Sequence, residues 1–558
     1  MALYSPISPE HFNDGNFDRN WFFQAYEQLG EQRFQMLYKS AKYITSGNNQ
    51  HRRSQLYTDA ALGKMDIQEL QAEIEEKRNQ DKLRCYALIP LDSTEPENLL
   101  RRYEFIQKFM RESRQFGAQR RENEMLACII AMENLALTAG FTDVNRMIWY
   151  LESEEFEEIR PLMEPKQIGT VTVKMEIDDE GLAGLVVEKQ GKRQKSLPKS
   201  LDKNEWILTL KDTIKQLKIQ KRRAGESLER AMIENTEFYV DELKKIGGNP
   251  VLAPIISKLV WTDGSEVGFI KKENGQMYLY GAGEDYRILK EQKMRVAHPH
   301  DLKLAGKWSD FMHYLYVHQI KQPFKQIFRE YYPLTEEERK ERTVSRRYEG
   351  YQVQPKKAAA LLKGRGWTVD YEEGLQKVFY KDNLIVRMFA MADWFSPADI
   401  EAPTLEGVQF FDRNTGEIAD LSDVSPIIFS EIMRDIDLAV SVAHVGGVDP
   451  ETSHSTVEMR VAIAKELLFL LKLSNVEFIG NHAKIRGNLS NYSVHMGSGV
   501  VHSEGSGMIA VLPVHSQARG RIFLPFADDD PKTAEIMSKI ILFADDRKIK
   551  DANILRQI

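Results

Sequence analysis

Cysteine is almost absent from this chain, since only Cys85 and Cys128 occur among 558 residues. Two thiols exclude a disulfide framework and a zinc site built from cysteines, and they suit a reducing compartment. No stretch approaches the ~18 consecutive apolar residues of a membrane-spanning helix. The opening sequence MALYSPISPEHFNDGNFDRN also lacks the apolar core of a signal peptide. We therefore expect a cytoplasmic protein with no membrane span.

An overall positive charge is also lacking, because the formal net charge is -7 at pH 7. This value excludes a generally basic nucleic-acid coat but leaves local basic patches open. Hydrophobic residues make up 42% of the chain and charged residues 28%, which is typical of a globular protein with sizeable cores. The length suggests about three or four domains.

The apolar periodicity changes along the chain and predicts a multidomain α+β fold. Residues 1–165 read as a helical domain, with apolar residues three and four apart. Residues 166–340 combine small antiparallel β segments with long helices at 203–245 and 300–332, and Glu273–Gln276 has the composition of a hairpin turn. Residues 341–558 read as a mixed α+β domain. Its helices are expected near SPIIFSEIMRD and STVEMRVAIAKELLFLL, and a strand meander follows.

Several long stretches carry a resemblance to a known family, notably KQPFKQIFREYYPLT, IIFSEIMRDIDLAVSVAHVGGVDPETSHSTVEMR and VLPVHSQARGRIFLPFADDDPKTAEI. The chain resembles the C-terminal part of the bacterial domain-of-unknown-function-4132 family, which is related to proteins named as molybdate-metabolism regulators. The resemblance covers most of the chain. It implies a regulatory role and supplies no catalytic residues. Members are often longer, so the chain is expected to be a partial member or a fragment.

Histidines concentrate near the C-terminus, where six of twelve lie between positions 444 and 515. Imidazole is a common metal ligand and a near-neutral acid or base, so the candidate catalytic residues are His444, Asp449, His454 and Glu458. His444 is expected at the end of a buried strand, AVSVA, and Asp449 is either a ligand or base or a simple turn residue. His454 and Glu458 either form a functional pair or flank a capping box in which Ser455 begins the helix.

A second set of residues is a candidate for ligand binding: Arg434, Arg460, His495, His502, His515 and Arg519. Arg434 lies in an apolar helix, where its charge either joins an internal ion network or meets an acidic substrate. His495 and His502 precede glycine-rich loops that lack the signature of a nucleotide-binding loop, so we expect hairpin turns and histidines on neighbouring strands. His515 precedes Ser516 without the elbow motif of a hydrolase. No cofactor or metal identity follows.

Two basic stretches, 101–121 and 211–223, interleave cationic residues with apolar ones. Such a pattern can follow a phosphate backbone, although on many helices the apolar residues face the core and the cations face water. Three functions therefore remain. The first is a regulatory or scaffold protein that binds another macromolecule, with a protein as its expected partner. The second is a metal-dependent or phosphate-handling enzyme, and the third is a nucleic-acid-binding protein. The oligomeric state is open.

Overall fold

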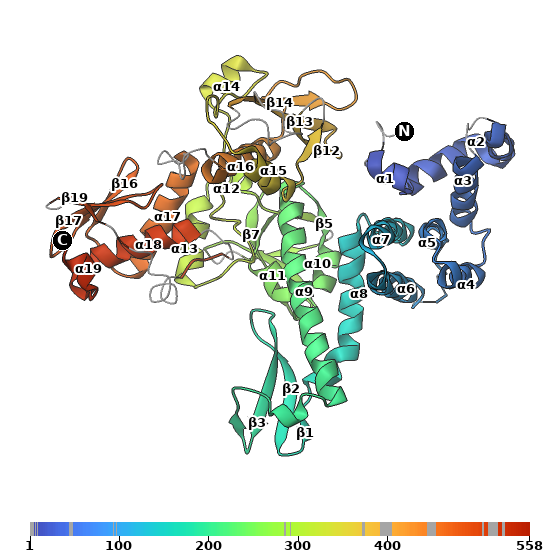
Figure 1. The fold of residues 1–558 in the computed structure, drawn as a ribbon, viewed down its shortest axis with the longest axis horizontal. Coiled ribbons are helices and arrows are strands. Elements are labelled where there is room, and N and C mark those ends of the chain that lie inside the picture. Colours follow the sequence, from blue (N-terminus) through green and yellow to red (C-terminus); the bar gives the residue numbers. More distant parts are fainter. Residues whose placement is uncertain are drawn as a thin grey trace. The chain divides into compact units, whose positions relative to one another are not determined.

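The computed structural model describes residues 5, 7, 9–43, 48–92, 94–95, 97–283, 286–290, 292–370, 374–390, 404–443, 454–504, 507–509, 511, 523–526 and 531–558. The chain divides into two compact units. The first comprises residues 1–158 with 379–383, and the second comprises 159–378 with 384–558. Helices build the first unit and a mixture of helices and antiparallel sheets builds the second, which confirms the α+β class (Figure 1). Among the described residues, no helix is both long and apolar enough to cross a bilayer.

The first unit is a stack of amphipathic helices around one core. In α6 the side chains of Phe105, Ile106 and Phe109 recur at helical spacing and are buried against α7, where Cys128 and Leu135 lie. The helices are α1 (Pro9–Asp14), α2 (Arg19–Ser40), α3 (Asn48–Ala61), α4 (Ile67–Lys77), α5 (Gln80–Tyr86), α6 (Asn98–Glu112), α7 (Ala118–Thr138) and α8 (Val144–Ile159).

A small sheet and a long helix open the second unit. The strands β1 (Lys166–Ile168), β2 (Val171–Ile177), β3 (Ala183–Lys189) and β4 (Lys192–Arg193) pair in sequence order, and β3 packs on α9 (Glu205–Ile233). The expected single helix over 203–245 is wrong. Asn235 takes a left-handed conformation with φ of 51°, and the Thr236 amide donates to the carbonyl of Ala231, so α9 ends there.

The next sheet has six strands in the order β5-β10-β6-β7-β8-β9. The predicted turn is confirmed, because Asn274 and Gly275 both have positive φ and join β7 to β8. The elements here are β5 (Phe238–Tyr239), α10 (Val240–Ile246), α11 (Ala253–Ser257), β6 (Val260–Thr262), β7 (Val267–Glu273), β8 (Gln276–Tyr280), β9 (Tyr286–Leu289), β10 (Lys293–Val296), α12 (Pro299–Leu304) and α13 (Trp308–Val317).

The helix expected up to residue 332 ends at Val317, and the connecting segment 318–334 has no regular structure. Gln319 has a positive φ of 51° and Pro323 follows, which together stop the helix. Residues 324–330 of this segment are nevertheless buried, so their backbone and their neighbours need hydrogen-bond partners. The side chain of Gln326 supplies several, accepting from the amide of Val260 and donating to the carbonyls of Val260 and Ala297.

The C-terminal half holds two further sheets and the remaining helices. Its elements are α14 (Glu336–Glu341), α15 (Pro355–Lys363), β11 (Thr368–Asp370), β12 (Gly374–Phe379), β13 (Leu384–Ala390), β14 (Leu405–Asp412), α16 (Pro426–Ala443), α17 (His454–Leu470), β15 (Val476–Ile479), β16 (His482–Arg486), β17 (Asn491–His495), β18 (Val501–Ser503), β19 (Gly507–Ile509), α18 (Pro531–Ala544) and α19 (Ala552–Leu555). Short 3₁₀ turns lie at Ala41–Tyr43, Ser113–Gln115, Arg160–Met163, Lys199–Leu201 and Asp546–Lys548. One apolar core joins α13, α17 and α18 to the sheet β15–β19.

The strand expected at AVSVA is also wrong, because α16 continues through these residues to Ala443. Ile432, Ile436, Ala439 and Val440 are buried at spacings of three and four, so the helical face extends into the β-branched run. Packing of that face outweighs the weak strand preference of valine. His444, which follows the helix, lies outside the described residues.

Candidate functional site

Helix α16 carries a buried row of polar side chains, and Glu431 is its most enclosed charged member. Arg329 donates to both Glu431 carboxylate oxygens at 2.7 Å, and His298 Nε2 lies 3.1 Å from one of them. Burial opposes ionisation of Glu431, but the charge and hydrogen bonds of Arg329 hold its carboxyl pKa well below the ordinary value. Burial lowers the pKa of His298, whose Nδ1 accepts from the amide of His300. His298 is therefore neutral and donates to Glu431 through Nε2.

The predicted binding residue Arg434 belongs to the same interior, where its Nε lies 3.0 Å from Glu330. Glu330 also pairs with the buried Lys325. Farther along the helix, Asp437 accepts hydrogen bonds from the hydroxyls of Tyr332 and Tyr348. These contacts match the internal ion network that the sequence left as one of two alternatives for Arg434, and they fix α16 against the connecting segment 318–334.

The predicted pair His454 and Glu458 is formed, with His454 Nδ1 3.3 Å from Glu458 Oε1. His454 is the first residue of α17, so one helical turn separates the two side chains. In the capping-box alternative, Ser455 would precede the helix and accept from one of its first amides. In the structure Ser455 lies within α17, and its hydroxyl donates to the carbonyl of Tyr331 at 3.4 Å. The two side chains are 82% and 67% exposed, which leaves the pair on the surface. A catalytic role for it stays a prediction.

Arg460 is buried and ties α17 to the turn after β17. Its Nε donates to the Thr533 hydroxyl, and its Nη1 donates to the carbonyls of Met496 and Gly497 at 3.0 Å each. Since these groups are protein atoms, Arg460 positions the turn that follows His495. Its assignment as a ligand-binding residue stays a prediction.

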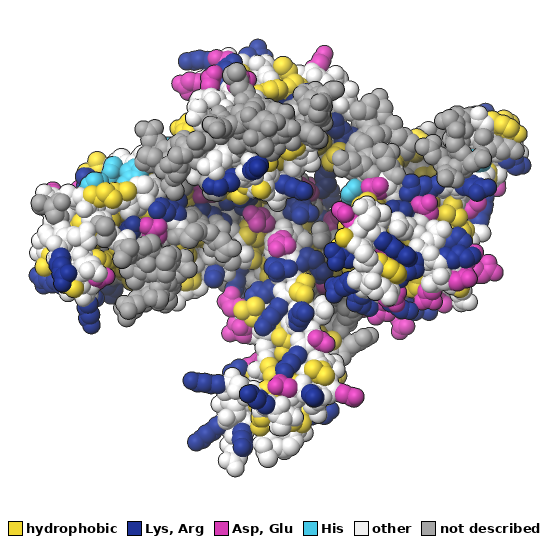
Figure 2. All heavy atoms as spheres, viewed as in Figure 1, with side chains coloured by type: hydrophobic (Ala, Val, Ile, Leu, Met, Phe, Trp, Pro, Cys, Tyr) yellow, Lys and Arg dark blue, Asp and Glu magenta, His cyan; other side chains and the backbone are white. Residues whose placement is uncertain are grey.

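Three histidines share the outward face of the sheet β15–β19. His482 lies directly opposite His495, with ring centroids 4.9 Å apart, and His502 lies opposite Ser493, two residues from His495. The expectation that His495 and His502 lie on neighbouring strands is confirmed. His495 Nδ1 lies 2.9 Å from the Ser498 hydroxyl and accepts a hydrogen bond from the Ser498 amide. This ring nitrogen is therefore already hydrogen-bonded within the protein. Figure 2 shows histidine side chains gathered at the end of the molecule where β16 lies.

Burial lowers the pKa of His495, and the neighbouring His482 and Arg460 lower it further. Burial also lowers the pKa of His482, with Lys484 and His502 adding to the effect. In the described part of the chain, no group of three or more His, Cys, Asp or Glu side chains could hold a metal ion. Asp449, His515 and Arg519 lie outside the described residues, as His444 does.

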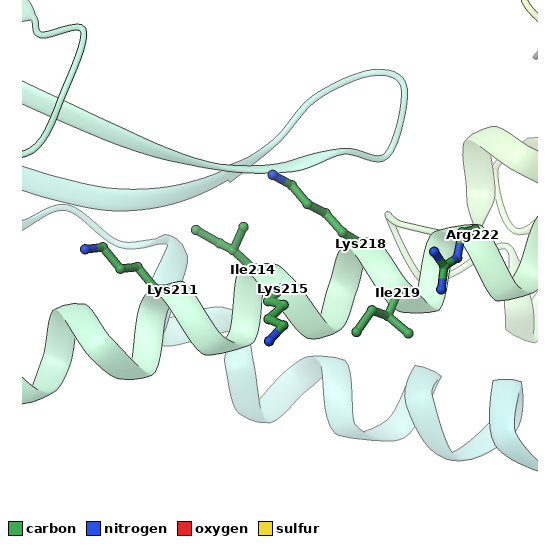
Figure 3. Close-up of a pocket in the computed structure, with 6 residues that line it drawn as sticks. All are labelled: Lys211, Ile214, Lys215, Lys218, Ile219 and Arg222. Carbon is green, nitrogen blue, oxygen red and sulfur yellow. The ribbon is translucent and has the colours of Figure 1, made fainter.

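Helix α9 carries a different kind of surface, which we call the basic stripe: Lys211, Lys215, Lys218 and Arg222. Their spacing of three and four residues aligns them along the helix, one residue after the buried positions Leu210, Ile214 and Leu217. A step of one residue turns the helix by about 100°, so the stripe runs beside the buried seam. All four side chains are exposed. They border an open hollow of about 390 Å³, and Figure 3 shows their charged ends spread apart along the helix.

The stripe is only partly neutralised by acidic neighbours. Lys211 pairs with Asp202 at 2.8 Å, and Arg222 lies 3.7 Å from Glu226. Within the described residues, Lys215 and Lys218 make no ion pair or side-chain hydrogen bond. Like charges three and four residues apart destabilise a helix, so the arrangement is unfavourable for the fold alone. An anionic partner would relieve the repulsion between these cations, which would favour its binding.

The other predicted basic stretch, 101–121, is only partly occupied by the fold, since Arg111, Arg114 and Arg121 are exposed and make no ion pair within the described residues. Arg101 pairs with Glu95, Lys108 with Glu75 and Arg120 with Glu124. Arg102 is buried and donates to the carbonyls of Ile89 and Pro90. The exposed Arg111, Arg114 and Arg121 lie on three separate elements, α6, the 3₁₀ turn Ser113–Gln115 and α7, so they do not form one row as the cations of α9 do.

Sequence reasoning missed the cationic residues that precede α9: Lys189, Lys192, Arg193, Lys195, Lys199 and Lys203. All are exposed. A charge count would have found them, since residues 189–223 hold 12 Lys or Arg against 3 Asp or Glu in a chain of net charge -7. Figure 2 shows Lys and Arg side chains gathered over the β1–β3 sheet and the adjoining part of α9.

Three family models match separate parts of the chain. Residues 191–367 match DUF4132, a domain of unknown function. Residues 1–151 match DUF5724, a family of unknown function, and residues 457–558 match DUF7737, a domain of unknown function. No curated protein and no solved structure matches the chain. The DUF4132 match confirms the family named in the resemblance for that segment of the chain.

The candidate features lie in different matched segments. The DUF4132 segment contains the basic stripe and nearly all of the cationic residues that precede it, together with Arg329. The DUF7737 segment contains Glu458, Arg460 and the histidine-bearing sheet. The basic surface and the histidine face therefore belong to different family models.

Proposed function

We propose that this protein is a cytoplasmic regulatory or scaffold protein that binds nucleic acid through the basic stripe of α9. The observation that carries the proposal is the row of exposed cations on one helix, two of which, Lys215 and Lys218, have no acidic partner among the described residues. Neutralising phosphates releases condensed counterions, which is the main source of sequence-independent affinity for nucleic acids.

The geometry of the stripe suits a phosphate backbone. Lys211 and Arg222 are eleven positions apart, which corresponds to about 16 Å along a helix. Four cations over that length can meet successive backbone phosphates. The rest of the chain has a net negative charge, which favours this basic surface as the site of nucleic-acid binding.

The regulatory part of the proposal rests on the resemblance to bacterial proteins named as molybdate-metabolism regulators, and the DUF4132 match supports the family alone, for residues 191–367. Placement of the chain at the C-terminal end of a longer family member belongs to the same proposal. A protein partner, as expected for a scaffold, is compatible with nucleic-acid binding at α9. The resemblance supplies no evidence that this chain handles molybdate.

Binding of a fluorescently labelled nucleic acid to the purified chain tests the proposal. The double variant Lys215→Gln/Lys218→Gln removes two charges from the stripe and should bind roughly tenfold more weakly at low salt, because two phosphate contacts are lost. The matched control is Lys356→Gln/Lys357→Gln, which removes two exposed charges from α15. Equal weakening in both variants, or in neither, would overturn the role of α9.

A further inference from the structure

The turn between β3 and β4 holds two lysines whose mutual repulsion does not stabilise the fold. Lys189 and Lys192 are directly opposed in the strand register, and both are exposed. Like charges directly opposite each other on paired strands are destabilising. Neither lysine makes an ion pair or side-chain hydrogen bond within the described residues. Arg193 follows, with its guanidinium 3.6 Å from Glu176.

The turn itself is tight and presents these cations at its tip. Gln190 and Gly191 have φ of 51° and 73°, the signs required at both central positions of a two-residue type I′ hairpin. Such a turn is short and holds its flanking residues in a fixed register. We call residues 189–193 the basic hairpin. It extends from β3, the strand that packs on α9, so the hairpin and the basic stripe belong to one small lobe.

Aromatic side chains are nearly missing from this lobe. Trp206 is the only aromatic residue in 166–223, and Lys166 lies 5.0 Å from the centre of its ring. Surfaces that bind single strands rely on aromatic rings on which bases stack. A surface with many cations and no free stacking ring instead suits the outside of a duplex, where phosphates are exposed and bases are not.

We infer that the nucleic acid bound at α9 is a duplex, and that the basic hairpin is a second element that contacts its phosphate backbone. The inference rests on the proposed function of the basic stripe and adds the partner's class and a second contact. Lys189 and Lys192 would meet the phosphates as point charges, so their contribution to binding is independent of sequence. The opposed lysines are held at the hairpin tip because the duplex backbone, rather than the fold, neutralises them.

The test compares three variants of the full chain: the hairpin variant Lys189→Gln/Lys192→Gln, the stripe variant Lys215→Gln/Lys218→Gln and the α15 control. The probe is a labelled duplex of roughly two helical turns, beside one of its single strands. The hairpin variant should bind the duplex several-fold more weakly and reduce the slope of log K against log salt by about two units. Its melting temperature should be unchanged or higher, because a repulsion has been removed.

The outcomes distinguish a failure of the hairpin contact from a failure of nucleic-acid binding at α9. If the stripe variant weakens binding and the hairpin variant matches wild type in affinity and slope, the hairpin contact is overturned and the proposed function stands. If neither variant differs from the α15 control, both fail. A single strand that binds as tightly as the duplex would overturn the assignment of a duplex.

Discussion

At the residue scale, the interior of the second unit is organised by charges that the fold itself satisfies. Arg329 is fully buried and its guanidinium bonds both to Glu431 and to Glu229. Charges inside a core are tolerated only when partners replace the lost water. The sequence identified Arg434 as a charge within an apolar helix, but it could not identify its partner, because Glu330 lies about a hundred positions earlier in the chain.

Loss of Arg329 should be among the most damaging single changes. Arg329→Met keeps much of the volume but leaves Glu431 as an uncompensated buried charge, so we expect a loss of about 3–5 kcal/mol in the free energy of unfolding. Urea titration followed by tryptophan fluorescence measures it. Glu229→Gln is the control, since Glu229 is 35% exposed and should cost much less. Equal losses for the two variants would show that burial of the ion pair is not what matters.

The histidine face predicts a dependence of stability on pH. Because burial and the charges of His482 and Arg460 lower the folded-state pKa of His495, the unfolded chain binds a proton more readily. Stability is therefore fully present above the ordinary histidine pKa of about 6.5 and falls as the pH drops below that value towards the folded pKa. Burial likewise lowers the pKa of His298, which adds to the loss in the same range.

The variant His495→Asn isolates one contribution. An asparagine oxygen can still accept from the Ser498 amide, as Nδ1 of His495 does, but it does not titrate. Unfolding free energies at pH 7.5 and pH 5.5 should differ less in this variant than in wild type, by a fraction of the ~1.4 kcal/mol per pH unit that one linked proton can give. A variant with the same pH dependence as wild type would contradict this account of His495.

At the element scale, regular elements were predictable where one physical signal dominated. The paired strands β7 and β8 followed from an Asn-Gly turn between alternating residues. Predictions failed where tertiary packing or a single backbone conformation decided the outcome. The helix end at Asn235 depends on one left-handed residue, and the irregular segment 318–334 depends on Gln326 bonding to strands far away in sequence.

The β7–β8 turn gives an element-scale prediction. Gly275 has a φ of 76° with open space around the position of a Cβ, so Gly275→Ala meets no clash and pays only for the left-handed backbone, about 1–2 kcal/mol. Thermal unfolding should show a lower melting temperature. Gly184→Ala in β3 is the control, because its surroundings are equally open and its φ is not positive. A comparable loss in the control would contradict this reading of the turn.

At the scale of the whole molecule, charge is distributed unevenly, and this distribution carries the proposed function. The sequence predicted 211–223 as a basic surface, and the structure places four of its cations, Lys211, Lys215, Lys218 and Arg222, on an exposed face of α9. It also predicted 101–121 with equal weight, although the fold buries Arg102 and pairs several of the other charges with acidic side chains. Composition alone cannot separate a free charge from a paired one, since pairing depends on residues brought together by folding.

The candidate site in the C-terminal half was predictable only in part. The pairing of His454 with Glu458 and the neighbouring positions of His495 and His502 followed from helical and strand spacing. The opposition of His482 and His495 needed the register of β16 and β17, which the sequence did not supply. The buried position of Arg460 likewise depends on Thr533, on a helix that follows much later in the chain.

The salt dependence of duplex binding tests the central claim most directly. If the basic stripe contacts phosphates, log K should fall linearly with log salt, and the slope for Lys215→Gln/Lys218→Gln should be shallower than the wild-type slope by about two units. The α15 control should keep the wild-type slope. A stripe variant whose slope equals that of wild type would contradict the claim that α9 binds nucleic acid.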